Sequence, residues 1–359
     1  MSEERKGDIV RPTLADVAHE ADVSAITVSR TIRQPHIVAE KSRRRVEAAI
    51  EKLGYIPDAA ASALASRTSS MIGLLVPSLT NNVFTDVLRG VYEVVEGSRY
   101  FVQIANSRYS ALKEETLVRA FLRQRPAGLI VAGFDQTDRG RDMLNGAACP
   151  VVQVLEHGPE PVDMAVGFHH AEAAALATRH LLDSGYRRPG FLAARMDPRT
   201  QRRMRGFERT CRDAGALDAR RIVTTHQAST VGLGRQLLEL LLCQAPETDA
   251  IFCANDDLAV GALMEAKRRR IRVPEDLGIC GFNDLEMTRH MYPAITSVAT
   301  PRFETGRQAA TMLLEEIAEP GSVGRRNRDL GVELMVREST MRPPGPQPAA
   351  ETHAEGKAP

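Results

Sequence analysis

From Met71 onward the chain alternates short apolar segments with amphipathic ones, and this alternation restricts the fold more than any other feature of the sequence. Residues 72–76 form an almost unbroken apolar run like a buried strand, whereas apolar residues recur at helical spacing between Phe84 and Val95. Such alternation predicts parallel sheets with helices on both faces. The expected strands cover residues 72–76, 101–105, 129–132, 151–155, 190–193, 222–225, 250–254 and 277–281.

The region 71–340 is too long for one doubly wound sheet, so we expect an α/β body of two lobes, each a parallel doubly wound subdomain. We expect the N-lobe to comprise residues 71–167 and 299–325, and the C-lobe to comprise residues 168–298 and 326–340. After Met341 the chain becomes Pro-Pro-Gly-Pro-Gln-Pro and then polar, so residues 341–359 are expected to form a disordered tail.

Residues 12–57 have a different pattern, which predicts an all-α head of three short helices. Thr13 and Ser24 can each cap a helix N-terminus, and Gly54 suits the end of the third helix. The first two helices are separated by the tight turn of a helix-turn-helix. The expected core of this head consists of Leu14, Val17, Ala18, Ala21, Val28, Ile32, Val46, Ala49, Ile50 and Leu53.

The net charge is only +1, but basic residues are concentrated in one part of the head. Between Thr27 and Arg45, six Lys and Arg side chains stand against the single carboxylate of Glu40. One basic face could contact phosphates while the head as a whole stays neutral. The same residues could equally form a solvated helix surface, and charge alone leaves both interpretations open.

Residues 58–70 join the head to the body. Asp58 can cap the alanine-rich segment 59–66, which is too short to be stable as an isolated helix. Residues 67–70 form a polar linker.

The composition excludes several classes of protein. Apolar residues make up 43% of the chain, yet no stretch approaches the roughly 20 consecutive apolar residues that span a bilayer, and residues 1–12 lack a signal sequence. The five cysteines contain no CxxC pair, and there is no Walker loop, GxSxG motif, metal-spaced His/Cys cluster or cofactor fingerprint. We therefore expect a cytoplasmic protein that is not an enzyme, without membrane contact, metal or cofactor.

Short motifs in the head and the body together form a specific pattern. In the head they are Thr13-Leu14, Asp16-Val17-Ala18, Ala21, Val23-Ser24, Thr27-Val28-Ser29-Arg30, Val46 and Leu53-Gly54-Tyr55-Ile56-Pro57. In the body they are Gly73, Pro77, Arg203-Met204-Arg205-Gly206-Phe207, Ala254-Asn255-Asp256, Val273-Pro274, Gly281-Phe282 and Glu338-Ser339-Thr340. Across residues 12–340 this pattern resembles the LacI/GalR family of repressors. The resemblance implies a DNA-binding head on a two-lobed body like that of periplasmic binding proteins.

Four segments of the body are most similar to the gluconate-utilisation repressors of that family. They are residues 76–81, 165–168, 252–261 and 297–302. The resemblance implies a transcriptional repressor that binds a palindromic double-stranded operator as a homodimer and responds to a small sugar acid, gluconate or a relative. Inducer and corepressor behaviour both occur in the family.

The second helix of the head would then be the recognition helix, with its N-terminal residues in the major groove. Arg30 can contact guanine bidentately, and Ala25 and Ile26 suit a thymine methyl group, although these two could instead pack against the body. The resemblance makes Leu64 a minor-groove wedge, with an ordinary linker residue as the alternative. The other predicted DNA contacts are Thr13, Ser24, Thr27, Ser29 and Arg33.

Polar side chains follow the carboxyl ends of several expected strands, where open α/β sheets bind their ligands. The predicted effector contacts are Ser78, Asn81, Phe84, Asp135, His169, Arg195, Arg203, Phe252, Asn255 and Asn283. The resemblance supports Arg203 and Asn255 most directly, although Asn255 or Asp256 could simply cap the next helix. A guanidinium at Arg195 or Arg199 would suit a carboxylate, whereas Arg199, Arg202 and Arg205 could also form a solvated helix face.

The sequence departs from the family pattern at two places. His169-His170 stands where the family often has Asp-Asn, and Asn283 stands where many sugar-binding members have Asp. Fewer carboxylates mean less repulsion of an anion, which favours an acidic ligand over a neutral sugar, and His170 could also be a helix cap. A periplasmic sugar-binding protein would share the body, but the head and the missing signal sequence argue against it. The histidine pair alone is weak support for an enzyme.

Overall fold

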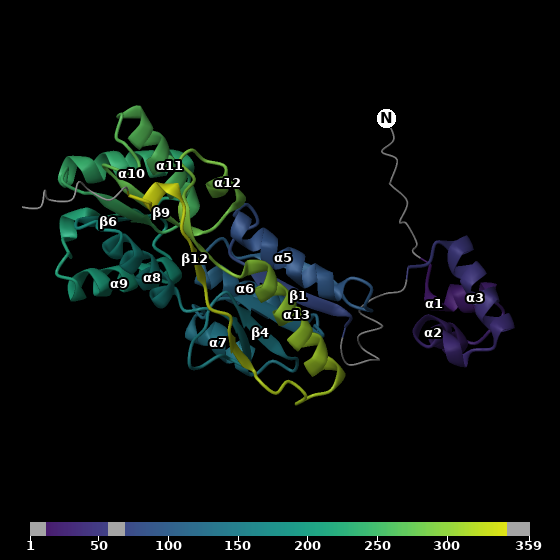
Figure 1. The fold of residues 1–359 in the computed structure, drawn as a ribbon. Helices are drawn as coiled ribbons and strands as arrows, with labels where there is room; N and C mark the ends of the chain where they lie inside the picture. The colour runs from purple at the N-terminus through teal and green to yellow at the C-terminus, as the bar shows by residue number, and fades with distance from the viewer. Residues whose placement is uncertain (1–11, 57–68, 343–359) are drawn as a thin grey trace, which may run out of the picture. The chain divides into compact units, whose positions relative to one another are not determined.

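The computed structural model describes residues 12–56 and 69–342, which belong to two compact units, one within 1–69 and one within 70–359 (Figure 1). The first unit contains the head and the second contains the body. Residues 57–68, with Leu64 and most of the expected linker, and residues 343–359 of the expected tail lie outside the described residues.

The head is a bundle of three helices and one short 3-10 turn. Its elements are α1 (Leu14–Glu20), α2 (Ala25–Arg33), η1 (Pro35–Ile37) and α3 (Glu40–Leu53). The Thr13 hydroxyl accepts a bond from the Asp16 backbone N–H, and the Asp16 carboxylate accepts one from the Thr13 backbone N–H at 2.7 Å. The Ser24 hydroxyl caps α2 in the same way, and Gly54 ends α3 in the left-handed conformation, with φ +61°. All three predicted caps are confirmed.

A single apolar core holds the head together. Every residue predicted for this core belongs to it, and Val23 and Tyr55 join them. The helical periodicity of the sequence therefore identified the buried face of each helix correctly.

The N-lobe is built on a six-stranded parallel sheet with the strand order β11-β5-β4-β3-β1-β2. The strands are β1 (Met71–Val76), β2 (Phe101–Asn106), β3 (Gly128–Ala132), β4 (Val151–Val154), β5 (Met164–Gly167) and β11 (Asn327–Asp329). Helices α5 (Asn82–Val95) and α13 (Arg302–Ala318) pack on one face of this sheet. Helices α6 (Ala111–Arg123) and α7 (Asp138–Asn145) cover the other face.

The C-lobe repeats this architecture with the strand order β12-β10-β9-β8-β6-β7, in which only the β10–β12 pair is antiparallel. The strands are β6 (Pro189–Ala193), β7 (Ile222–Thr224), β8 (Ala250–Cys253), β9 (Gly278–Asn283), β10 (Thr296–Ala299) and β12 (Glu333–Met335). Figure 1 shows α8 (His170–Asp183) and α9 (Pro198–Asp213) on one face, with α10 (Val231–Gln244) and α11 (Asp256–Arg268) on the other. The short elements are η2 (Ala219–Arg221), α12 (Glu286–Arg289) and η3 (Glu338–Thr340).

The chain passes between the lobes three times: after β5, between β10 and α13, and between β11 and β12. The predicted boundary between residues 325 and 326 is wrong, because β11 pairs with β5 in the N-lobe sheet, Asn327 opposite Ala165 and Asp329 opposite Gly167. This edge strand reads Asn-Arg-Asp and carries no apolar pattern that would reveal a strand.

All eight predicted strands are present, and the four that the sequence analysis missed have only three or four residues each. None of the described helices is both long and apolar enough to cross a membrane.

Two glycines allow the closest backbone approach in the N-lobe, between α5 and α13. A Cβ atom on Gly90 would lie 2.1 Å from the carbonyl oxygen of Phe303, and one on Gly306 would lie 2.1 Å from that of Val87. No side chain can be accommodated at either position unless the two helices separate.

We therefore expect Gly90→Ala to lower the free energy of unfolding by about 1–3 kcal/mol, the usual cost of overpacking. Urea unfolding followed by circular dichroism measures this in a chain that contains no Trp. Gly324→Ala is the matched control, because nothing lies within 4 Å of its added Cβ. Equal stability of the two variants would contradict the close packing of α5 against α13.

Candidate functional site

The exposed face of α2 is the candidate nucleic-acid interface. Ala25, Ile26, Ser29 and Arg30 line a shallow groove there, together with Leu14 and Gln34. The Ile26 side chain is 64% exposed, although it occupies the first turn of the helix. An exposed apolar group beside an exposed guanidinium suits the thymine methyl groups and guanine acceptors of a major groove.

Most of the basic side chains on α3 are paired with acidic residues of the head itself. Arg45 contacts Asp22 at 2.7 Å, and Lys52 contacts Glu20 at 2.6 Å. Arg30 on α2, in contrast, makes no ion pair with any described residue. It therefore remains available to an external partner.

Three of the remaining predicted DNA contacts have local structural roles. Thr13 and Ser24 are helix caps, and the Thr27 hydroxyl lies 2.9 Å from that of Ser24. Arg33 is the last residue of α2, and its side chain lies outside the part of the structure that is described. Contact of these residues with phosphate stays a prediction.

The second candidate site is a cavity between the lobes, with an empty volume of about 600 Å³ including its open mouth. It lies at the carboxyl ends of strands from both sheets, which is the usual ligand position in open α/β folds. The residues that line it are Asn81, Val83, Phe84, Tyr109, Leu155, Phe168, His170, Ala194, Arg195, Asp197, Arg199, Thr200, Arg203, Ser229, Asn255, Asn283 and Thr300.

Six of the ten predicted effector contacts lie in this lining: Asn81, Phe84, Arg195, Arg203, Asn255 and Asn283. Of these, Arg195 and Asn283 have left-handed backbone conformations, with φ of +67° and +106°. Residues other than glycine seldom adopt such conformations, and they cluster at ligand sites.

The other four predicted contacts lie outside the lining. Phe252 is fully buried in the C-lobe core, because its position in β8 points it into the sheet packing. The Ser78 hydroxyl accepts bonds from the backbone N–H groups of Thr80 and Asn81, so it shapes the turn before α5. Asp135 is paired with Arg202, and His169 faces a different cluster on the surface. The prediction of Phe252 is wrong, because its side chain is fully buried, and effector contact by Ser78, Asp135 and His169 stays a prediction.

The lining also contains residues that the sequence analysis did not select, notably Tyr109, His170, Asp197, Arg199 and Ser229. The sequence analysis left two alternatives for Arg199, binding of a carboxylate or a place on a solvated helix face, because its position in a helix does not show whether its side chain is buried. In the structure Arg199 is 9% exposed, Arg202 is half-buried and Arg205 is exposed. The three arginines thus have three different environments.

Guanidinium groups dominate the electrostatics of the cavity. Arg195, Arg199 and Arg203 all line it, and the only carboxylate in the described lining is that of Asp197. Burial opposes ionisation of Asp197, but the charges of Arg199 and Arg203 outweigh it and lower the pKa of the carboxyl. Burial and the positive charge of Arg199 lower the pKa of Arg203 to about 10, although Asp197 opposes them. The lining therefore holds three guanidinium groups against one carboxylate, which is an excess of positive charge.

Aromatic rings hold the three guanidinium groups in place, and for Arg199 the ring is that of Phe84, 5.9 Å away. Arg195 lies 4.0 Å from the centre of the Tyr109 ring, and Arg203 lies 4.4 Å from that of Phe282. Arg203 also donates to the carbonyl oxygen of Ala254, at the end of β8. Planar guanidinium groups fixed in this way can bind a carboxylate with little loss of entropy.

Asn255 lines the cavity with part of its hydrogen-bonding capacity unused. The Asn255 side-chain oxygen caps α11 by accepting from the Leu258 N–H, and it also accepts from the Ser229 hydroxyl at 2.9 Å. Its amide nitrogen makes no bond within the described structure. Asn255 can therefore cap α11 and contact a ligand at the same time, so the two roles predicted from the sequence do not exclude each other.

His170 lines the cavity as a neutral imidazole. Burial, with the nearby charges of Arg203 and Arg199, lowers its pKa well below the ordinary value. Its Nε2 lies 3.1 Å from the Leu155 carbonyl oxygen, so Nε2 carries the proton and Nδ1 is left as an acceptor without a partner among the described residues.

Beside the cavity, Arg202 on α9 of the C-lobe bridges two carboxylates of the N-lobe. Its Nη2 lies 2.8 Å from Asp135 and its Nε lies 2.9 Å from Glu156. Burial raises the pKa of Glu156 to about 7, although Arg202 opposes this. This bridge is an electrostatic link between the lobes next to the ligand site.

Comparisons with known proteins identify the family. The profile of the bacterial regulatory proteins, lacI family, matches residues 13–58, and that of the periplasmic binding protein-like domain matches residues 178–340. An HTH-type transcriptional regulator GntR from Pseudomonas aeruginosa is 41% identical over 330 residues, which cover 92% of this chain and 96% of the relative. The chain belongs to the LacI family of bacterial transcriptional regulators. Its head is therefore a helix-turn-helix DNA-binding domain, as the sequence motifs predicted.

Solved structures agree with this LacI-family assignment. A LacI-family transcriptional regulator from Silicibacter pomeroyi has a TM-score of 0.87 and 31% identity. The match covers 92% of this chain and 100% of the Silicibacter pomeroyi chain. The transcription regulator GntR from Chromobacterium violaceum has a TM-score of 0.71 and 39% identity over 75% of this chain and 99% of its own. The predicted two-lobed α/β fold is confirmed.

Burial of Glu156 makes the stability of this LacI-family regulator dependent on pH. The Glu156 carboxyl binds a proton between its ordinary pKa of 4.5 and about 7 in the folded protein but not in the unfolded chain. Its contribution to stability therefore falls as the pH rises through that range. Glu156→Gln removes this titration. As the pH rises through the range, the free energy of unfolding of the variant should therefore increase relative to that of the wild type, by up to about 3 kcal/mol.

Urea unfolding at about pH 5 and about pH 7.5 tests the direction of this change in stability, because most of the titration of the Glu156 carboxyl takes place between these two pH values. Glu93→Gln, at an exposed position, is the control and should show no comparable change. A difference between Glu156→Gln and the wild type that is the same at both pH values would contradict the prediction.

Proposed function

We propose that this LacI-family protein is a transcriptional repressor that binds a palindromic operator as a homodimer under the control of a small sugar acid, gluconate or a close relative. The observation that carries the proposal is the convergence of Arg195, Arg199 and Arg203 on the interlobe cavity against the single carboxylate of Asp197. A cavity with this charge favours an anionic ligand.

The rest of the lining fits the hydroxylated chain of a sugar acid. The Asn255 amide can donate to a hydroxyl group, and His170 offers an acceptor. Phe84, on the N-lobe side, can cover the apolar C–H face of such a ligand. The similarity of four body segments to the gluconate-utilisation repressors supports the same ligand class.

The lining does not resemble a catalytic site. The Ser229 hydroxyl donates to Asn255 and not to a general base, and the buried His170 donates to a backbone carbonyl. The relatives at high identity are regulators. We therefore propose a regulator without catalytic activity or cofactor, acting in the cytoplasm where bacterial DNA is found.

Control of DNA binding would operate through the position of the two lobes. A ligand that contacts Phe84 on the N-lobe and Arg203 on the C-lobe binds one lobe arrangement more tightly than another. It can shift the equilibrium only by that difference in affinity, typically about 1–3 kcal/mol. Two heads in a dimer would bind two half-sites about one helical turn apart.

Isothermal titration calorimetry of the full chain with gluconate tests the effector. Arg195→Gln should weaken binding by about 10- to 100-fold, because a hydrogen bond to a charged group contributes about 1.5–3 kcal/mol. Arg205→Gln, on the exposed side of α9, is the matched control and should bind like the wild type. No heat of binding with gluconate or any related sugar acid would overturn the proposed ligand class.

Selection of sites from a pool of random duplexes tests the DNA-binding proposal. The full chain should select a palindrome, and Arg30→Ala should lose about 1–3 kcal/mol of affinity for it and relax the base preference at one position per half-site. Lys52→Ala also removes a positive charge, from a residue paired with Glu20, and should keep the base preference. If Arg30→Ala selects the same site with the same affinity, Arg30 is not a base contact.

A further inference from the structure

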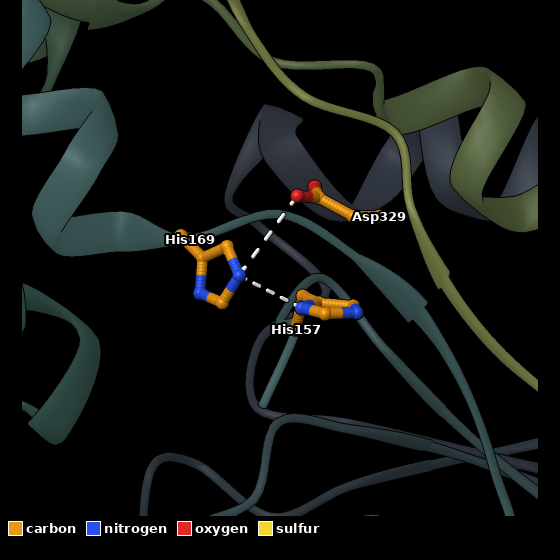
Figure 2. Close-up of side chains that lie close together, drawn as sticks. All are labelled: His157, His169 and Asp329. Atoms are coloured by element: carbon orange, nitrogen blue, oxygen red, sulfur yellow. Dashed lines mark hydrogen bonds and ion pairs between the residues drawn. The ribbon is translucent and has the colours of Figure 1, made fainter. Parts of the chain in front are cut away.

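Two histidines and an aspartate meet where the chain passes between the lobes (Figure 2). His157 Nδ1 lies 2.8 Å from His169 Nε2, and that same Nε2 lies 3.8 Å from Asp329 Oδ2. One ligand atom from each residue lies within 4.8 Å of the other two. We infer that these three side chains form a binding site for one divalent transition-metal ion, with zinc best matched to the ligand set.

The three residues are far apart in the sequence and come from different elements. His157 lies in the connection between β4 and β5, His169 is the residue before α8, and Asp329 ends β11. They are 12 and 160 positions apart, which is why the sequence showed no metal-spaced motif. The topology of the N-lobe sheet, in which β4, β5 and β11 are neighbours, brings them together.

Backbone and side-chain bonds fix the three segments to one another. The His157 N–H donates to the Phe168 carbonyl at 3.0 Å, and the Leu330 N–H donates to the Gly167 carbonyl at 2.8 Å. The Asn327 amide also donates to the Gly158 carbonyl at 2.8 Å, which ties β11 to the segment that carries His157. Preorganised ligand positions of this kind reduce the cost of binding an ion.

The distances between the side chains are close to those between the ligands of one ion. Zinc lies about 2.0–2.2 Å from nitrogen and oxygen ligands, so neighbouring ligands of a tetrahedral site are about 3.3 Å apart. The observed separations of 2.8 Å and 3.8 Å lie on either side of that value. The longer one is too long for a hydrogen bond, so the Asp329 carboxylate is directed at the pair without bonding to it.

The chemistry of the ligands agrees with the geometry. Two imidazoles and a carboxylate form a set that binds zinc and similar ions, with water able to complete the coordination. The His169 ring does not cap α8, although it occupies the cap position, so it has no competing structural role there. The side chains of His169 and Asp329 are 45% and 36% exposed, which leaves a path for the ion.

The surrounding charges do not block the site. Arg325 acts on His157 as a positive charge, but the carboxylate of Asp329 opposes it. Glu172, the nearest other carboxylate on α8, is held by Arg209 at 2.7 Å and does not compete as a ligand.

Calorimetric titration of the untagged, chelator-treated full chain with zinc chloride tests the inference. We expect one ion per chain. Loss of a residue that hydrogen-bonds a metal ligand usually weakens metal binding about 10- to 100-fold. His169→Ala and Asp329→Asn each remove a ligand itself, so each should weaken zinc binding by at least this factor. His290→Ala, another exposed histidine outside the cluster, is the matched control and should bind zinc like the wild type.

Two further measurements separate metal binding from folding. Circular dichroism without metal should give the same melting temperature for His169→Ala and the wild type, and zinc should raise that temperature only in the wild type and in His290→Ala. Cobalt should give the visible absorption of a low-coordinate histidine site, and His157→Ala should abolish it. Equal zinc affinity in the wild type and His169→Ala would overturn the inference. The result does not depend on gluconate or operator binding.

Discussion

Both sheets of the body present the carboxyl ends of their parallel strands to the same cavity, and the arrangement of the site follows from this constraint. A parallel strand must be followed by a crossover, so the residue after each strand lies at the ligand end of the sheet. Arg195 follows β6, Asn255 follows β8 and Thr300 follows β10 in this way. Polar side chains that are spread over more than two hundred residues of sequence therefore lie together at the cavity.

The collected side chains place an excess of positive charge in a partly buried space. Burying a guanidinium is unfavourable unless other groups solvate it, and here aromatic rings, a backbone carbonyl and Asp197 do so. The compensation is incomplete, because Asp197 is one carboxylate facing Arg195, Arg199 and Arg203. An anionic ligand would supply the missing negative charge.

The lobes are connected by more than the chain that passes between them. Arg202 joins α9 to Asp135 and Glu156, and Arg302 joins the start of α13 to Asp86 and to the Asn283 carbonyl. The Arg202 pairs and the bond from Arg302 to the Asn283 carbonyl join the two lobes, so movement of the lobes must exchange these contacts. The cluster of His157, His169 and Asp329 lies at two of the crossings, which places the proposed ion where the chain passes between the lobes.

The sequence by itself determined the helix-turn-helix head, because its helices carry a clear 3.6-residue apolar period between recognisable caps at Thr13, Ser24 and Gly54. It also determined the α/β alternation of the body and the cavity residues Asn81, Arg195, Asn255 and Asn283, since strand ends can be located from apolar runs. Only the tertiary structure decided that Phe252 packs in a core and that β11 belongs to the N-lobe. The side of a strand on which a residue is buried, and the pairing of a short polar strand, depend on contacts between distant segments. No local period of the sequence records those contacts.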